Sequence, residues 1–199
     1  MKFNTPEELL VNMSDIDYGF YDLYTDKWVS STKNTKQFLW AEQHNTDVVS
    51  MPKEVAKSRM GTCWDCTLLA YEELCKIPRV SDIQAIYCEH EEANDDTCNK
   101  ETHTAVIFQY SSGSIPVWRW FEHAWLDYRG VNGPYLNKDV CMERLQELFN
   151  ERHSIKKLPN SETTDIFKTW DIKSFLKDNR NKKYVMPAEF MNYCKYGSY

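Results

Sequence analysis

Residues 60–74 read MGTCWDCTLLAYEEL and place two cysteines, Cys63 and Cys66, at the start of the most strongly helical pattern in the chain. Apolar residues recur at helical spacing between Gly61 and Pro78, which predicts a helix that begins at or just before Cys63. Three interpretations of the cysteine pair are open. It could be a redox CxxC motif, half of a zinc site, or one reactive thiol at a helix N-terminus beside a second cysteine that only packs.

The composition predicts a globular protein. Of the 199 residues, 42% are hydrophobic and 14% are aromatic, which is enough for one domain with a substantial core. The net charge of −6 argues against nucleic acid as the main partner, and no stretch approaches the roughly 20 apolar residues of a membrane span. The N-terminus lacks the features of a secretory signal and the cysteine count is odd, at seven. We therefore expect a cytoplasmic protein with free thiols.

The order of predicted elements indicates an α+β fold in a single domain, 1–199. Turn residues and hydrophobic spacing predict helices at 6–13, 38–45, 51–60, 63–75, 137–152 and 171–178, and strands at 82–89, 102–110 and 115–122. Residues 90–101 are polar and acidic and are predicted to form a loop. The N-terminal 1–51 and the C-terminal 136–199 are expected to be helical or irregular extensions packed on the core.

Redox and zinc chemistry are the weaker interpretations of the cysteine pair. A thioredoxin-like CxxC follows a strand, whereas the residues before Cys63 are polar and helical in pattern. A zinc site needs four ligands, commonly from two close pairs. Cys88, His90, Cys98 and His103 do not form a regular second pair, so a zinc-stabilised interaction domain is kept as an alternative.

A nucleophilic role fits Cys63 better. A thiol at a helix N-terminus lies at the positive end of the helix dipole, which favours the thiolate, and the free N–H groups there can stabilise an oxyanion. Such a nucleophile needs a base within hydrogen-bond reach and a group that orients the base. His103 and His123 are the candidate bases, because the other three histidines lie in polar segments.

A predicted hairpin favours His103 as the base. If Ser112 and Gly113 form a two-residue turn, His103 lies directly opposite Glu122, with both side chains on one face of the sheet. A carboxylate in that position would fix the tautomer of the imidazole. His123 would point to the other side of its strand.

These residues resemble the transglutaminase-like superfamily, in particular its small bacterial and phage members. Gly61-Thr62-Cys63-Trp64 is similar to the Gly-x-Cys-Trp around the nucleophile of that family, and "THTAVIF…WFEHAW" is similar to its His strand and acid strand. The similarity runs from about residue 52 to 135. It implies a papain-like core in which the nucleophile-bearing helix packs on an antiparallel sheet.

The resemblance also implies roles. Cys63 would be the nucleophile, His103 the general base and acid, and Glu122 the orienting acid. Glu stands where Asp is commoner, and the His-Ala-Trp at 123–125 resembles the motif at the catalytic His of many relatives, so His123 is the alternative base. Asp65 is expected to stabilise the helix dipole.

The implied chemistry is attack of a Cys63 thiolate on a carboxamide, giving a thioester acyl-enzyme. Water would then make the protein a peptidase or deamidase, and an amine would make it a transamidase. We expect a protein or peptide substrate and no cofactor, metal, nucleic acid or membrane partner; for a phage protein the location is the host cytoplasm. The alternatives are a binding module that keeps the fold without catalysis, and the zinc-stabilised domain using Cys63 and Cys66.

Overall fold

Two β-sheets and seven helices make up the α+β fold of the described chain, so the predicted class is confirmed at this level. The computed structural model describes residues 2–93, 98–113, 115–154 and 162–197. In chain order the elements are α1 (Pro6–Met13), β1 (Asp17–Asp22), β2 (Lys27–Ser30), α2 (Thr35–Gln43), β3 (Asp47–Ser50), α3 (Pro52–Ser58), β4 (Met60–Gly61), α4 (Cys63–Leu74), β5 (Val80–Ala93), β6 (Cys98–Tyr110), β7 (Val117–Glu122), the 3-10 turn η1 (Leu126–Tyr128), β8 (Gly130–Tyr135), α5 (Lys138–Ser154), β9 (Glu162–Trp170), α6 (Ile172–Asp178), β10 (Tyr184–Val185) and α7 (Pro187–Tyr196).

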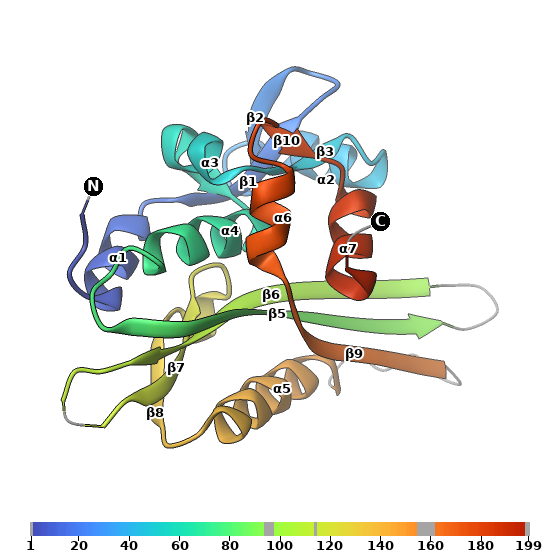
Figure 1. Cartoon of the computed structure of the whole chain (residues 1–199). Helices are drawn as coiled ribbons and strands as arrows, with labels where there is room; N and C mark the ends of the chain where they lie inside the picture. The colour runs from blue at the N-terminus through green and yellow to red at the C-terminus, as the bar shows by residue number, and fades with distance from the viewer. Residues whose placement is uncertain (1, 94–97, 114, 155–161, 198–199) are drawn as a thin grey trace.

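The larger sheet has the order β8-β7-β6-β5-β9, and every neighbouring pair is antiparallel. Helices α4, α6 and α7 lie over one face and α5 lies over the other (Figure 1). Alternate residues of β6 serve the two faces: Val106 and Phe108 join the core under α4, whereas Ala105 and Ile107 join the core against α5. The sheet is therefore buried on both sides, which holds the start of α4 firmly against β6.

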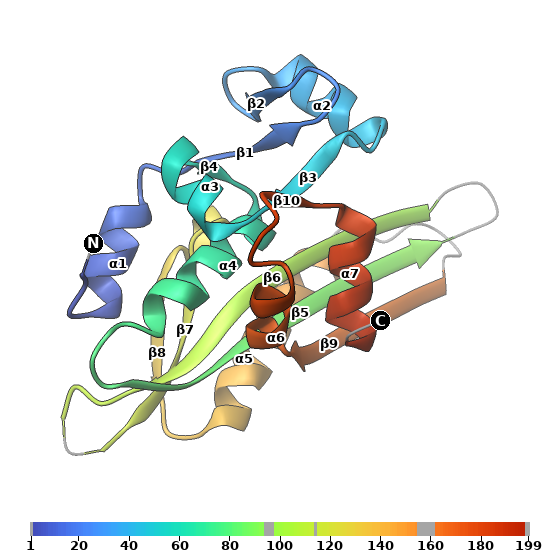
Figure 2. The same ribbon diagram turned by 45° about the horizontal axis from the view of Figure 1, so that its top comes forward.

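The smaller sheet has the order β10-β3-β1-β2, and the short strand β4 pairs in parallel with β1. It lies on the far side of α4 from the larger sheet, with α2 packed beside it (Figure 2). Gly19 in β1 is required by close packing, because a Cβ there would lie 2.3 Å from the Val29 carbonyl oxygen. The N-terminus of α4 thus opens between the two sheets.

Both extensions contain strands, so the prediction that they are helical or irregular is wrong in part. The N-terminal part supplies β1, β2 and β3, and the C-terminal part supplies β9 and β10. β9 pairs with β5 from Ala85↔Trp170 to Ala93↔Glu162. These strands are rich in polar residues or are very short, so their sequences carry little alternation and the pairing partner decides their conformation.

The predicted loop at 90–101 is largely strand. β5 continues to Ala93 and β6 begins at Cys98; residues 94–97 of the predicted loop lie outside the described residues. Cross-strand contacts between charged side chains replace apolar packing at this end, as between Lys100 and Glu91 at 3.3 Å. No helix in the described ranges is long and apolar enough to cross a membrane.

Candidate active site

Cys63 is the first residue of α4, as the sequence predicts, and its side chain is 7% exposed. The carbonyl oxygen of Cys63 accepts a hydrogen bond of 3.1 Å from the Thr104 hydroxyl on β6. The Thr104 and Thr67 hydroxyls lie 3.0 Å apart, and Thr67 donates to the Thr104 carbonyl. This network fixes the start of α4 to the strand that also carries His103.

Asp65 holds the N-terminus of α4 in place rather than only interacting with its dipole. It is fully buried, and its carboxylate accepts hydrogen bonds from the Thr62 N–H at 2.7 Å, the Thr62 hydroxyl at 2.9 Å and the Ser50 N–H at 2.5 Å. Burial raises the pKa of this carboxyl to about 7. Gly61 fits here because of space: a Cβ would lie 2.9 Å from the Asp65 Cβ. Asp65 therefore positions Cys63 without facing it.

The predicted register of the β6–β7 hairpin is wrong by two residues. The strands pair from Tyr110↔Val117 to Val106↔Phe121, so the connection spans residues 111–116 rather than a two-residue turn; Ser114 of that connection lies outside the described residues. Continued to Glu122, this register places it opposite Ala105 rather than His103. A shift of two keeps every side chain on its original face. His103 and Glu122 consequently become diagonal neighbours on one face.

The His103 and Glu122 side chains meet despite this offset. Nε2 of His103 lies 2.6 Å from Oε2 of Glu122, which is 2% exposed. The other carboxylate oxygen accepts a 2.9 Å hydrogen bond from the Trp125 backbone N–H. The Trp125 ring packs edge-on against the imidazole, with centroids 5.2 Å apart. Both the carboxylate and the imidazole are thus fixed in orientation.

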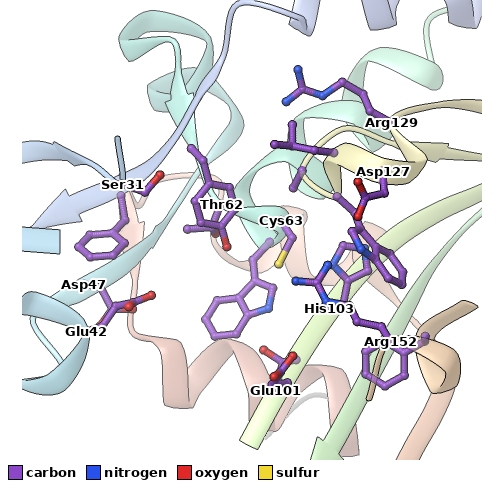
Figure 3. Close-up of a pocket in the computed structure, with 18 of the residues that line it drawn as sticks. Ser31, Glu42, Asp47, Thr62, Cys63, Glu101, His103, Asp127, Arg129 and Arg152 are labelled. Carbon is purple, nitrogen blue, oxygen red and sulfur yellow. The ribbon is translucent and has the colours of Figure 1, made fainter. Parts of the chain in front are cut away.

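The Cys63 side chain, at the start of α4, faces the His103 side chain on β6. Figure 3 shows the Cys63 sulfur directed at the His103 ring. Because Nε2 is taken by Glu122, Nδ1 is the ring nitrogen left for the thiol. Burial alone would lower the pKa of His103, but the Glu122 carboxylate and a hydrogen bond to Cys63 outweigh it and raise the pKa to about 10. His103 is therefore an imidazolium at neutral pH, and an imidazolium favours the thiolate form of a neighbouring thiol.

His123, the alternative base, is engaged elsewhere. Its Nε2 donates a 2.6 Å hydrogen bond to the Met13 carbonyl, and burial together with the Arg129 charge lowers its pKa. The ring is 5% exposed. His123 is thus a neutral, structural histidine that ties α1 to the end of β7.

The second cysteine of the pair, Cys66, is a core residue. It is 2% exposed, and burial raises the pKa of its thiol well above the usual range. Among the described residues, no three His, Cys, Asp or Glu side chains are grouped so that they could hold a metal ion. The side chain of Cys98, one of the ligands considered for zinc, lies outside that part of the chain.

A cleft of about 720 Å³ opens above Cys63 and His103. One wall comes from the smaller sheet and α2, and the other from the 124–129 segment and α5. Trp64 and Trp125 line the cleft, whereas Trp118 and Trp120 belong to the core against α5. A thiol and a histidine at the base of a cleft of this size have room for an extended peptide segment.

The sequence does not identify two groups that hold this site in place, Thr104 and the Trp125 backbone N–H. Thr104 contacts the Cys63 carbonyl, which is 41 positions away in the chain, and the Trp125 N–H donates to Glu122 across the bend that follows β7. Trp40 and Gln43 of α2 do not line the cleft and so cannot serve as oxyanion donors there; Trp40 stacks on His44 with ring centroids 4.2 Å apart. For Thr104 the sequence does indicate the direction of the side chain, because alternation along β6 puts it on the face opposite His103 and so toward a helix.

Comparison with known proteins adds no relative: no family model matches the chain, and neither a curated protein nor a solved structure is significantly similar to it.

Proposed function

We propose that this protein is a cysteine-dependent amide hydrolase or acyltransferase with a transglutaminase-like, papain-like core. The observation that carries the proposal is the chain of contacts from Cys63 to His103 to Glu122 at the base of the cleft. A nucleophile, a base and a group that orients the base, in mutual contact, are the minimum set for covalent acyl transfer. A cross-strand pair that served only stability would not need a thiol beside the imidazole.

The reaction would begin with attack of the Cys63 thiolate on a carboxamide carbon. The Cys63 N–H is the first of α4 and has no acceptor within the helix, so it can donate to the developing oxyanion. His103 would give its Nδ1 proton to the leaving amine or ammonia as the C–N bond breaks, which leaves a thioester on Cys63. Glu122 stabilises the imidazolium before this step and fixes the neutral tautomer after it.

The neutral His103 would then act as a base on the second substrate. It would take a proton from water or from an amine, the thioester carbonyl would be attacked, and the thiolate would leave to restore the ion pair. Water gives a free acid and an amine gives a new amide. Peptidase, deamidase and transamidase activities therefore share this site and differ in the second nucleophile.

Alkylation by an iodoacetamide probe with peptide mapping tests the proposal without knowledge of the substrate. Cys75 is an exposed free cysteine of the same chain and serves as the internal reference. At neutral pH, Cys63 should react at least tenfold faster than Cys75, because the neighbouring His103 imidazolium favours the reactive thiolate. Equal rates at the two positions contradict the proposal.

Two matched variants sharpen this experiment. His103→Asn should reduce the rate at Cys63 to that of an ordinary thiol, whereas His123→Gln, which can still donate to the Met13 carbonyl, should leave it high. Activity follows from incubation with glutamine-containing peptides, with and without a fluorescent primary amine. If the Cys63→Ala variant binds a stoichiometric partner as tightly as the parent does, and the parent forms no product, the protein is a binding module instead.

A further inference from the structure

Charged side chains line the cleft around Cys63, and two of its carboxylates lie close together. Glu42 at the end of α2 and Asp47 at the start of β3 lie together on one wall. Arg129 and Arg152 lie on the opposite side of Cys63, as Figure 3 shows. Asp127 lies on the same side as the two arginines and Glu101 also lines the cleft, so the nucleophile stands between an acidic wall and a wall of mixed charge (Figure 3).

The acidic wall has no cation of its own among the described residues. Partial burial and the neighbouring Asp47 raise the pKa of Glu42, and partial burial and Asp22 raise the pKa of Asp47. Asp22 lies behind them and is fully buried. The hydrogen bonds to its carboxylate come from neutral donors: the Tyr24 N–H, the Thr25 hydroxyl and the Gln37 side-chain amide. Asp47 thus has a like charge on either side, Glu42 on the cleft wall and Asp22 behind it.

The two arginines cannot relieve this repulsion. The Arg129 Nε donates a 2.6 Å hydrogen bond to the His123 carbonyl, and the Arg152 guanidinium lies 5.2 Å from the centre of the Trp125 ring. Both contacts hold the cations on the far wall. A positive group brought in by a ligand would lower the electrostatic energy of the acidic wall.

We propose that Glu42 and Asp47 form the subsite that recognises a positively charged side chain, lysine or arginine, of the substrate peptide. The inference rests on the proposed function, since the subsite belongs to the cleft that presents the amide to Cys63. A peptide lying across the cleft would place its basic residue against this wall and its amide at Cys63, with Arg129 and Arg152 available for an acidic group further along. A substrate with an acidic residue at this position would meet like charges on Glu42 and Asp47.

Charged thiol reagents of similar size test the subsite directly. Methanethiosulfonates react with a thiolate to form a mixed disulfide and release methanesulfinate. We would compare the cationic trimethylammonium-ethyl reagent, the anionic sulfonatoethyl reagent and the neutral methyl reagent at Cys63, by mass spectrometry of peptides. At low ionic strength the cationic reagent should react about tenfold faster than the anionic one, and high salt should reduce the ratio.

The variants identify the source of the preference. Glu42→Gln combined with Asp47→Asn should bring the cation-to-anion ratio at Cys63 down at least threefold. Glu143→Gln combined with Asp178→Asn removes the same two charges outside the cleft and should leave the ratio unchanged. An equal fall in both double variants, or no fall in the first, overturns the proposal.

Stability and the neutral reagent separate the remaining explanations. Removing Glu42 and Asp47 should leave the melting temperature unchanged or raise it, because repulsion is removed; a clear fall would show that the carboxylates are structural and overturn the subsite. If the neutral reagent reacts no faster at Cys63 than at Cys75, the proposed catalytic function fails. The ratio of the cationic to the anionic reaction rate at Cys63 can still be measured in that case, because any accessible thiol reacts with these reagents. That ratio then tests the subsite independently of catalysis.

Discussion

His103 and Glu122 are diagonal neighbours on adjacent strands, not directly opposed residues, and their side chains still meet at 2.6 Å. Diagonal positions on an antiparallel pair lie about 7–8 Å apart, a distance that long side chains can span. Glutamate has one methylene more than aspartate and suits this offset. The departure from the commoner Asp therefore has a geometric reason in this protein.

Shortening or neutralising this acid should weaken the site in two distinguishable ways. Glu122→Asp keeps the charge but should lose the direct contact with His103, whereas Glu122→Gln keeps the length and loses the charge. Because the Glu122 charge is a main cause of the raised His103 pKa, Glu122→Gln should lower that pKa more. NMR titration of the imidazole resonances measures it. A His103 pKa that is unchanged in Glu122→Gln would show that the carboxylate does not stabilise the imidazolium.

The raised pKa of His103 also predicts how stability depends on pH. The pKa is about 10 in the folded protein against 6.5 for an ordinary histidine, so the folded state holds the proton more tightly. The resulting stabilisation is fully present below about pH 6.5 and is lost as the pH rises toward 10. Urea unfolding of the parent and of His103→Asn across this range should give a difference that shrinks as the pH rises. A constant difference would contradict the ion pair.

Sequence reasoning identified the residues of the candidate site but not how they are held. The helix beginning at Cys63 follows from local signals, namely the glycine before it and the apolar spacing after it. His103 and Glu122 lie on one face of the sheet, as predicted, although the predicted register is wrong. Side chains alternate faces with a period of two along a strand, and the register error is two residues. A slip of one residue would have separated them, so the parity of the error decided the outcome.

The remaining parts depend on contacts between distant segments. β9 takes its conformation from β5, and its own pattern of polar residues gives no sign of burial. The acceptor role of the Cys63 carbonyl depends on Thr104, which lies 41 positions further along the chain. Such pairings are decided by tertiary packing, which local propensity and spacing do not encode.

Thr104→Val tests the tie between the nucleophile helix and the base strand. The substitution keeps the shape of the side chain and removes the hydroxyl that contacts the Cys63 carbonyl and Thr67. We expect a loss of about 1–3 kcal/mol in the free energy of unfolding, since buried groups lose their partners. Cys63 should also alkylate more slowly at a temperature where the variant is fully folded. Thr169→Val, at an exposed position on β9 outside the cleft, is the control and should leave both quantities within experimental error of the parent.

Asp65→Asn tests the cap of α4. The two carboxylate oxygens of Asp65 accept from the Thr62 N–H and the Ser50 N–H, whereas an asparagine amide offers one oxygen and one N–H₂ group. At least one buried N–H therefore loses its acceptor. Denaturant unfolding should show a loss of about 1–3 kcal/mol. The labelling ratio of Cys63 to Cys75 should fall with it, because the start of the helix is no longer fixed. Unchanged stability would mean that Asp65 does not anchor this end of the helix.

Gly61→Ala tests whether the glycine before the nucleophile is required for space. A Cβ there would lie 2.9 Å from the Asp65 Cβ and 3.2 Å from a Val55 methyl group, and neither neighbour is the far end of a flexible side chain. We expect overpacking to cost about 1–3 kcal/mol in unfolding free energy. Gly113→Ala in the β6–β7 connection, where an added Cβ meets nothing within 4 Å, is the control. If Val55→Ala restores the stability of Gly61→Ala, the clash with that methyl group is the cause; if Gly61→Ala is as stable as the parent, the start of α4 tolerates the added methyl and the requirement for glycine is wrong.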